Sequence, residues 1–475
     1  MRYLFQVLLL VSVSNLCGQK QGNIWMFGDG GALDFNMGTP SAFSGSPIFG
    51  SPQQSGHYLY SEGCASISDS SGNLLFYSNG MKVWNKLNQI MPNGNNLNGY
   101  YSSTSAAFII PKPLSDSLYY LFTTDGLERY LGNGLQYSTI NRCLDNGKGD
   151  VIESQKNILL LDTVSEKLCA IAHPNGIDIW LIAHKYLTNS FYAYLITPSG
   201  INAPIITNIG SVHTGNLSIF NGFGAAIGQM KASSNGTKIG LVFSNVTPSV
   251  AEIFDFNLTT GILSNVISLQ TYGNEYGVEF SPDNTKLYTT SFGGIRQFDI
   301  SSGNQATINS SVTQISSAVC LPASIQLGPD GKIYVTRCSN SLGVINAPNY
   351  LGTSCNYVNN SINISPASNN TSLPSFIAGY NYKNNKIPEC SILSGIETTN
   401  LQSEIQLFPN PASETLTISL PENNPNTDCI LFDNLGKELR RFVVTGGENL
   451  VDVSGLESGS YQLKIGKQLQ KIFKH

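Results

Sequence analysis

The sequence predicts an all-β protein in which a seven-bladed β-propeller is followed by a small immunoglobulin-like β-sandwich. One cassette of short strands and tight turns recurs along most of the 475 residues. Charged residues make up only 12% of the chain, about half of the roughly 25% that is usual in soluble domains, and turn-forming residues are abundant instead. After Tyr380 a polar stretch separates this pattern from a second group of short strands.

The clearest copy of the cassette lies within residues 275–303. Tyr276 to Phe280 alternates as a strand, Pro282 to Thr285 forms a tight turn, and Lys286 to Thr290 returns before a third strand begins. The same turn recurs six times, at Gly72, Asp116, Gly176, Gly236, Asn284 and Gly331. These spacings suit four-stranded blades, which take about 40 to 50 residues each, with insertions in the second and third.

Two incomplete cassettes at the ends of the repeat region predict the seventh blade. Ile24 to Gly28 and Gly31 to Phe35 have the pattern of a second and a third strand without a first. Leu373 to Ala378 matches the first strand of the preceding blade, Leu321 to Gln326. We therefore expect Leu373–Ala378 to join Ile24–Gly28 in one sheet, which closes the ring and leaves no open sheet edge.

The N-terminus predicts export. Arg2, an apolar run from Leu4 to Val13 and the small or polar residues after it form a secretory signal peptide, with cleavage expected near Gly18. We expect a signal peptide at 1–18, the propeller at 19–380, a linker at 381–403 and the sandwich at 404–475. No later segment is long and apolar enough to be a transmembrane segment of the mature chain. A net charge of −5 without a Lys/Arg cluster argues against nucleic acid as a partner.

The cysteines predict a disulfide rather than a metal site. Eight of the nine cysteines remain once the signal peptide is removed, and export permits disulfides. Cys320 and Cys338 flank the turn at Pro329-Asp330 almost symmetrically, so we expect them to bond across neighbouring strands. Cys390 in the linker either tethers the two domains or is a free thiol. No CxxC pair is present, so we expect no zinc.

No catalytic motif is present: the chain has no HExxH, no GxSxG and no Gly-rich phosphate loop. His173 and His184 are placed to face each other at one rim, where capping of hydrogen bonds is the expected role. The other histidines, His57, His213 and His475, and the tryptophans Trp25, Trp84 and Trp180, give no site either; the tryptophans are expected to pack between blades. We therefore predict no catalytic residue, no metal and no cofactor.

The repeat region resembles a family of exported seven-bladed propeller proteins (WD40/YVTN-like) common in Bacteroidetes. The resemblance rests on Glu62 to Asp69, Val83-Trp84-Asn85 and Met91 to Gly94 in the opening blade, and on Ile109 to Pro113 and Tyr276 to Asp283 further on. It covers the whole repeat region. It implies a fold and an export route rather than an activity.

The segment Glu404 to His475 predicts a sandwich of short alternating strands that carries several spaced motifs. The motif residues are Pro409, Asn410 and Pro411; Asp433, Gly436 and Lys437; Asp452, Leu456, Gly459 and Tyr461; and the basic Lys471 and Lys474. This segment resembles the type A C-terminal sorting domain of the type IX secretion system. The resemblance implies that the partners are the secretion machinery and its sortase, that the chain passes the inner and then the outer membrane, and that the tail is usually cleaved.

These observations predict an exported cell-surface or secreted protein that binds or adheres to a glycan, peptide or surface ligand without catalysis. The alternative is a carbohydrate-active hydrolase or lyase, because carboxylates from different blades can converge in the channel. Clustered acidic and aromatic residues with raised carboxylate pKa values at one channel mouth would favour the enzyme. A mouth lined by Asn, Ser and Thr would favour binding.

Overall fold

The computed structural model describes residues 20–43, 62–213, 225–243, 249–317, 323–369, 371, 373–380, 390, 405–422, 425–433, 437–466 and 468–475. The chain divides into two compact units, residues 1–392 and 393–475, which are described separately. The predicted signal peptide, and the predicted linker except for Cys390, lie outside the described residues.

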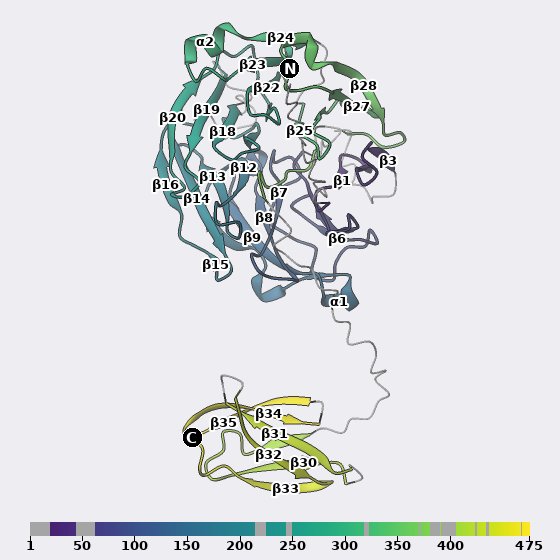
Figure 1. Cartoon of the computed structure of the whole chain (residues 1–475), viewed down its shortest axis with the longest axis vertical. Helices are drawn as coiled ribbons and strands as arrows, with labels where there is room; N and C mark the ends of the chain where they lie inside the picture. Colours follow the sequence, from purple (N-terminus) through teal and green to yellow (C-terminus); the bar gives the residue numbers. More distant parts are fainter. Residues whose placement is uncertain are drawn as a thin grey trace, which may run out of the picture. The chain divides into compact units, whose positions relative to one another are not determined.

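The first unit is a propeller of seven antiparallel sheets, which we number as blades in chain order (Figure 1). The predicted seven-bladed fold is therefore confirmed. Blade one contains β1 (Ile24–Phe27), β2 (Gly31–Asp34) and β3 (Ser41–Phe43); blade two contains β4 (Ala65–Ser68), β5 (Leu74–Ser78) and β6 (Val83–Asn85); and blade three contains β7 (Ala107–Pro111), β8 (Leu118–Thr124), β9 (Leu135–Asn141), β10 (Asp150–Val151) and β11 (Ile158–Leu161). Blade four contains β12 (Val164–Ala172), β13 (Ile179–Lys185), β14 (Ser190–Thr197), β15 (Gly200–Ile201) and β16 (Ile205–Asn208), and blade five contains β17 (Met230–Ala232), β18 (Lys238–Phe243), β19 (Val250–Phe256) and β20 (Leu263–Ser268). Blade six contains β21 (Gly277–Phe280), β22 (Lys286–Ser291), β23 (Gly294–Asp299) and β24 (Thr313–Ser316), and blade seven contains β25 (Ile325–Leu327), β26 (Ile333–Val335), β27 (Ser341–Ile345) and β28 (Tyr357–Asn363).

The first strand of each blade lies nearest the propeller axis. First strands of neighbouring blades contact one another, as β4 contacts β1 and β7, and β17 contacts β12 and β21. The strands β4, β7 and β21 are buried at every position, whereas the outermost strand β20 is mostly exposed. Figure 1 shows β16, β20 and β28 at the periphery of the propeller. Among the described residues, two short α-helices, α1 (Leu144–Gly147) and α2 (Gln305–Ser310), lie in connections between strands.

The predicted turns fall between the first and second strands of blades two to seven, as expected. Gly72, Gly176, Gly236, Asn284 and Gly331 all have positive φ angles, between 62° and 89°. A residue with a Cβ atom is strained in this region, and Asn and Asp tolerate the strain best, which explains why Gly and Asn recur at this position of the cassette. Trp25, Trp84 and Trp180 are buried in apolar clusters, as predicted.

The ring closes differently from the prediction. Strand β1 is itself the first strand of blade one, because it pairs with β2 and lies beside β4. Leu373–Ala378 does not join that sheet; Pro374 bridges Cys64, and Ala378 bridges Ile171. The expected pairing of this segment with Ile24–Gly28 is therefore wrong, since the innermost position is already filled by the fully buried β1.

Packing joins the first blade to the last. The indole ring of Trp25 lies 5.3 Å from the ring of Tyr334 in β26 and 5.8 Å from that of Phe376, measured between centroids. The backbones of Asp29 and Ser368 exchange two hydrogen bonds, of 2.7 and 3.2 Å. Aromatic contacts and one short backbone bridge therefore close the ring.

Residues 373–380 run along the propeller axis, and we call them the plug. The Ala378 N–H donates to the carbonyl of Ala170 and the Ala378 carbonyl accepts from Ala172, both at 2.9 Å. Ile377 and Tyr380 are buried against the apolar residues of blades three and four. The plug thus ties several inner strands together.

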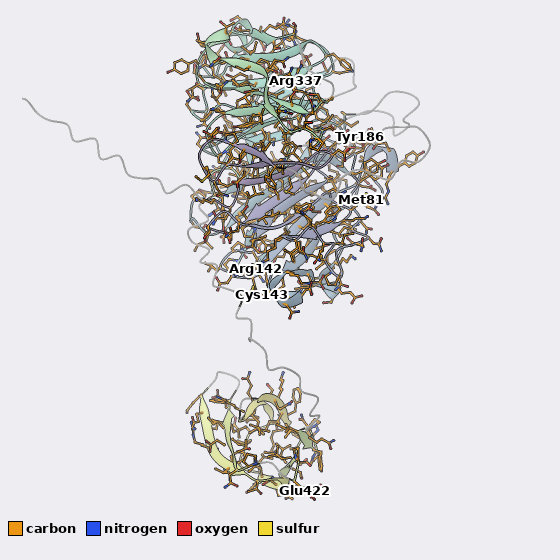
Figure 2. The ribbon with its side chains drawn as sticks, turned by 90° about the vertical axis from the view of Figure 1, so that its right-hand side faces the viewer. Met81, Arg142, Cys143, Tyr186, Arg337 and Glu422 are labelled. Carbon is orange, nitrogen blue, oxygen red and sulfur yellow. A yellow bond between two sulfur atoms is a disulfide. The ribbon has the colours of Figure 1, made fainter. Side chains whose placement is uncertain are left out.

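Beyond the plug, Cys390 forms a disulfide with Cys143, with the two Cα atoms 5.2 Å apart. Cys143 lies two residues after the end of β9 in blade three, and Figure 2 labels it on the propeller. Of the two roles left open for Cys390, a free thiol is excluded, and the bond is made within the propeller unit. The predicted linker is therefore fastened to the propeller at this point.

The second unit is a sandwich of two antiparallel sheets. One sheet contains β29 (Gln406–Phe408), β30 (Thr415–Leu420) and β33 (Gly447–Asp452). The other contains β31 (Thr427–Phe432), β32 (Glu438–Val444), β34 (Gly459–Ile465) and β35 (Gln468–Lys474). Alternate residues of these strands, including Leu416, Ile418, Leu431, Leu463 and Ile472, form its buried core. The predicted sandwich is confirmed.

The plug can be tested by two truncations. A chain that ends at residue 392 keeps the plug and Cys390, whereas a chain that ends at residue 372 loses both. Because each large buried side chain contributes about 2–5 kcal/mol, we expect the shorter chain to melt several degrees lower and to aggregate, and the longer one to melt like the propeller of the intact protein. Calorimetry with and without reductant separates the disulfide from the plug. Equal melting of both truncated chains would show that the plug is dispensable.

Candidate functional site

The first strands of the blades run in one direction along the axis, so the residues that precede them gather at one end. We call this end the upper rim and the opposite end the lower rim. Met81 and Tyr186 follow strands that end at the upper rim, and Arg142 and Cys143 follow one that ends at the lower rim. Figure 2 shows these two pairs toward opposite faces of the propeller.

A hydrogen-bonded group of carboxyl side chains lies at the upper rim. Glu166, at the start of β12, is fully buried. One of its carboxyl oxygens accepts from the N–H and hydroxyl of Thr104 at 2.9 and 3.0 Å, and the other accepts from the Leu127 N–H at 2.8 Å. The hydroxyl of Tyr276 donates to Glu62 at 2.7 Å. Residues that precede or begin four different blades therefore meet here.

Burial governs the ionisation of this group. Burial, followed by the charge of Glu128, raises the pKa of Glu166 to about 7. Burial, followed by the charge of Glu166, holds the pKa of Glu62 well above its usual value. Burial also lowers the pKa of Lys167 to about 7. The Lys167 amine donates to the carbonyls of Ala225, Ala226 and Ile227 at 3.1, 2.7 and 2.8 Å.

The outer part of the group is partly exposed and aromatic. Glu62, Glu128, Tyr100 and Tyr101 are each half-buried. The two tyrosine rings lie 4.4 Å apart between centroids, and the Ser102 hydroxyl donates to Glu128 at 2.7 Å. Glu166 has both oxygens engaged by the protein, whereas Glu62 accepts from Tyr276 with only one oxygen. The Oε2 atom of Glu128 is buried and has no hydrogen-bond partner among the described residues.

A pair of histidines lies beneath this rim. The rings of His184 and His213 are stacked, with centroids 3.2 Å apart, and both are fully buried. None of their ring nitrogens has a hydrogen-bond partner among the described residues. Burial first, and then the charge of Lys167, lower the pKa of His184; burial and the charge of His184 lower that of His213.

The predicted pairing of His173 with His184 is wrong. The two residues lie near opposite ends of β13, and the Nδ1 atom of His173 accepts from the N–H of Asn175 at 3.2 Å within its own turn. His184 stacks on His213 instead. Nothing in the sequence indicated this pair, because the two residues lie far apart in the chain. His57 lies outside the described residues, and His475 ends the sandwich.

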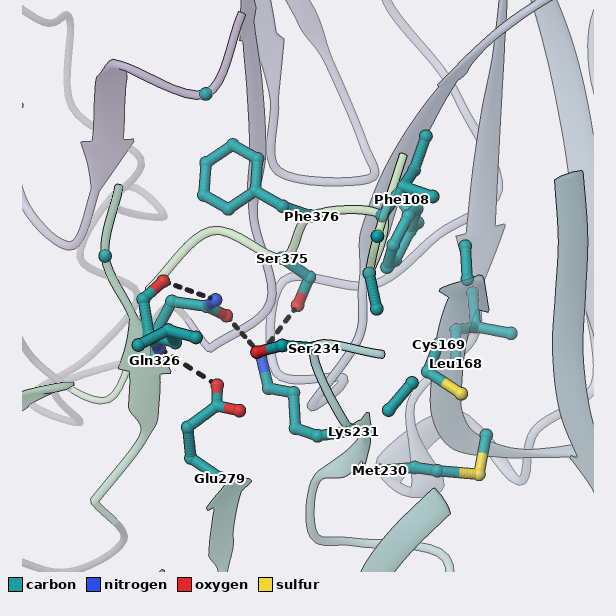
Figure 3. Close-up of a pocket in the computed structure, with 18 of the residues that line it drawn as sticks. Phe108, Leu168, Cys169, Met230, Lys231, Ser234, Glu279, Gln326, Ser375 and Phe376 are labelled. Carbon is teal, nitrogen blue, oxygen red and sulfur yellow. Dashed lines mark hydrogen bonds between the residues drawn. The ribbon is translucent and has the colours of Figure 1, made fainter. Parts of the chain in front are cut away.

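The channel itself contains a second group. A cavity of about 250 Å³ lies between the plug and the inner strands of blades three to seven. It is lined by apolar side chains together with Lys231, Glu279 and Gln326 (Figure 3). All three polar side chains are almost fully buried. This cavity reaches the lower rim, because Ser234 and Pro329 from the turns of that rim also line it.

The sorting-domain motif residues hold the turns of the sandwich. The Asn410 side chain donates to the Lys471 carbonyl at 3.0 Å and accepts from the Phe473 N–H at 2.8 Å, which fastens the turn Pro409–Pro411 to β35. The Asp433 carboxylate accepts from the Lys437 N–H at 2.9 Å at the turn after β31. Gly436 lies outside the described residues.

The remaining motif residues lie around β34 and β35. Asp452 accepts from the hydroxyl and N–H of Ser454 at 2.6 and 2.9 Å, and these bonds lower its pKa. Leu456 packs against the core, and the Tyr461 hydroxyl donates to the Glu457 carbonyl at 2.7 Å. Gly459 pairs with Lys474 in the ladder between the two strands. The motif therefore supports the closing strands of this sandwich.

The predicted bond between Cys320 and Cys338 stays a prediction, because Cys320 lies outside the described residues. Cys338 is disulfide-bonded. Cys169, Cys355 and Cys429 are buried free thiols, and Cys64 is also buried. In the described part of the chain, no cluster of three or more His, Cys, Asp and Glu side chains is arranged to hold a metal ion.

Comparison with known proteins identifies the second unit. Residues 406–475 match the family described as the secretion system C-terminal sorting domain. The sandwich is thus a type IX secretion system sorting domain, which implies interaction with the secretion machinery and indicates export across the outer membrane to the surface or the medium. Over the described residues, no helix is long and apolar enough to span a membrane. No curated protein sequence matches the chain.

Solved propeller structures are similar to the chain at low identity. A protein from Lactobacillus plantarum has 12% identity and a TM-score of 0.40, covering 74% of this chain and 99% of its own. Hsv2 of Kluyveromyces lactis has 9% identity and a TM-score of 0.37, covering 69% and 90%. PorZ, a surface component of the type IX secretion system of Porphyromonas gingivalis, has 10% identity and a TM-score of 0.31, covering 96% and 74%. These values carry no argument about activity.

Acid stability tests the buried histidine pair. A folded-state pKa below the unfolded value of about 6.5 means that each histidine takes up a proton on unfolding once the pH is below about 6.5. The free energy of unfolding therefore decreases as the pH falls below about 6.5. The raised pKa values of Glu62 and Glu166 change the stability in the opposite direction. Both carboxyl groups are present in the native chain and in the His213→Phe variant, so their effect cancels in the comparison. We expect His213→Phe to lose less free energy of unfolding between pH 7 and 5 than the native chain, by up to about 1.4 kcal/mol per pH unit.

Denaturant titrations across this pH range measure the difference. The two chains should change in parallel above pH 7.5, where both imidazoles are neutral in the folded and unfolded states, and this range serves as the control. Identical slopes below pH 6.5 would mean that the pair does not titrate on unfolding.

Export tests the last strand of the sandwich. A chain that ends at residue 470 loses the buried Ile472 and both partners of Asn410, so we expect it to remain in the periplasm of a bacterium with the type IX machinery. The double variant Lys471→Ala, Lys474→Ala keeps the strand and removes only its charges. Fractionation and immunoblotting measure both. Normal export of the truncated chain would contradict a need for β35; retention of the double variant would show that the charges are read directly.

Proposed function

We propose that the protein is an exported propeller that binds a glycan at the upper rim, around Glu62. The observation that carries the proposal is the half-buried pair of carboxyl groups, Glu62 and Glu128, next to the paired rings of Tyr100 and Tyr101. The sorting domain supports a location at the cell surface or in the medium, where glycans are accessible.

The chemistry of this surface suits a sugar. Carboxyl oxygens accept hydrogen bonds from hydroxyl groups, and charged acceptors form the stronger bonds. Tyrosine rings offer a rigid apolar face, which packs on the C–H face of a pyranose at small cost in side-chain entropy. The Tyr100 hydroxyl donates to that of Tyr101 at 3.1 Å, which holds the two rings together. Arg129, whose guanidinium lies 5.6 Å from the Tyr100 ring centroid, adds a donor at the edge of the same surface.

The second candidate function is glycoside hydrolysis or a lyase reaction at the same residues. The raised pKa of Glu62 favours it, because a general acid must hold its proton near neutral pH. Glu128 supplies the second carboxyl group that hydrolysis requires. Glu166 does not suit either role, since three hydrogen bonds from the protein engage it. The clustered carboxyl groups with raised pKa values and the paired tyrosines at this rim are the pattern expected above for the enzyme. Binding is the function that we propose, because it is the step that both candidates share.

Binding is tested with the intact protein on a glycan array, followed by calorimetric titration of the best ligand. We expect Glu62→Gln and Tyr101→Ala each to weaken binding at least tenfold, about 1.4 kcal/mol. Glu153→Gln and Tyr350→Ala change exposed residues of the same types elsewhere and should leave affinity unchanged. Equal affinity of all four variants would place the ligand at another surface.

Turnover separates the two candidates. The glycan that binds is incubated with the protein, and reducing ends or unsaturated products are measured. Absence of product over a day supports a binding protein. Product formation that is lost in Glu62→Gln and in Glu128→Gln, with the bound form still detectable, would establish the enzyme instead.

A further inference from the structure

The channel cavity holds an amine in an unusual setting. Lys231 lies on β17 of blade five, and its side chain is only 8% exposed. Its amine donates to the amide oxygen of Gln326 in blade seven and to the hydroxyl of Ser375 in the plug, the latter at 3.4 Å (Figure 3). Both acceptors are uncharged.

No described carboxylate lies within ion-pair distance of this amine, since none of the ion pairs among the described residues includes Lys231. One acidic group, Glu279, lines the same cavity and accepts from the N–H groups of Phe280 and Leu327 at 2.9 and 3.0 Å. Burial lowers the pKa of Lys231, and the charge of Glu279 opposes this only in part. A neutral amine is therefore favoured more than at the surface.

The hydrogen bonds also orient this amine. A neutral amine has two N–H donors and one lone pair. Gln326 and Ser375 take the two donors, so the lone pair is left for a third direction. The cavity around it is lined by apolar as well as polar side chains, with Phe108, Leu168 and Met230 among the apolar ones. Desolvation and a free lone pair are the conditions under which a lysine becomes a nucleophile.

The other potential nucleophile of the cavity, the thiol of Cys169, is unreactive. Burial raises the pKa of the Cys169 thiol to about 12, so this thiol stays protonated and weakly reactive. Lys167 at the upper rim differs from Lys231, because its amine donates hydrogen bonds to three backbone carbonyls.

We propose that Lys231 forms an imine with a small neutral aldehyde or ketone that enters this cavity from the lower rim. The Nζ lone pair bonds to the carbonyl carbon, and a proton moves from nitrogen to oxygen to give a carbinolamine. Loss of the second N–H proton and of the hydroxyl group then releases one water and leaves the C=N bond.

The cavity restricts the carbonyl compound. A volume of about 250 Å³ admits a molecule of a few heavy atoms, since one water takes about 30 Å³. A carboxylate on that molecule would lie near Glu279, and Lys231, whose amine is the nucleophile, is the single basic side chain among the lining residues. An uncharged hydroxyaldehyde is therefore favoured over an oxo acid. This inference concerns the lower rim and does not depend on the glycan site.

Reductive trapping tests the inference with the full chain. The protein is incubated at pH 7 with glycolaldehyde and cyanoborohydride, which converts an imine into a stable hydroxyethyl group, and the modified lysines are quantified by peptide mass spectrometry. We expect Lys231 to be modified at least tenfold faster than the exposed Lys86, with a rate that saturates in glycolaldehyde. Glyoxylate should modify Lys231 more slowly than glycolaldehyde does.

Two controls keep the result decisive. The rate at Lys231 should level off at a lower pH than the rate at Lys86, a difference that a purely structural lysine would not produce. Lys231→Met should abolish that peptide's modification and leave the modification of other lysines unchanged, with melting recorded to confirm the fold. Modification of Lys231 that is no faster than that of Lys86, or no modification at all, would overturn the proposal and leave Lys231 as a link between blades and plug.

Discussion

The packing of Trp25 against Tyr334 and Phe376 is the interaction on which the propeller depends. It joins the first blade, the last blade and the plug at one point, where the ring has no covalent continuity. A propeller must remove its sheet edges from solvent, and this one does so by apolar contact rather than by exchanging a strand. The order of the inner strands, and hence the position of every side chain at the two rims, follows from this closure.

The closure makes the two rims unequal. The plug fills part of the channel and reaches the lower rim, and the disulfide between Cys143 and Cys390 fastens the following chain there. The upper rim carries the carboxyl groups, the paired tyrosines and the buried histidines. A large ligand therefore has one rim with suitable chemistry, whereas the channel cavity beside Lys231 admits only a small one.

The repeat and the sorting tail could be predicted from the sequence because both are local. A turn residue with positive φ recurs with its flanking strands, and the tail motifs lie within seventy residues that match the sorting domain family. The way in which the ring closes could not be predicted from the sequence. Leu373–Ala378 has strand-like alternation, and its position depends on β1 already being the innermost strand of blade one. The candidate sites could not be predicted either, because Glu62, Glu166 and Tyr276 are far apart in the sequence and come together only when the blades form the ring. One signal was present: Glu166-Lys167, Lys231 and Glu279 interrupt otherwise apolar first strands, where a buried charge needs a reason.

The central claim is that ligand binds at the upper rim while the chain's own plug holds the channel. Hydrogen–deuterium exchange of the intact protein, with and without the best glycan from the array, tests it most directly. The account predicts added protection in residues 100–104 and 126–129 and unchanged exchange in residues 373–380. Protection confined to the plug or to the lower-rim turns, with none at the upper rim, would contradict it.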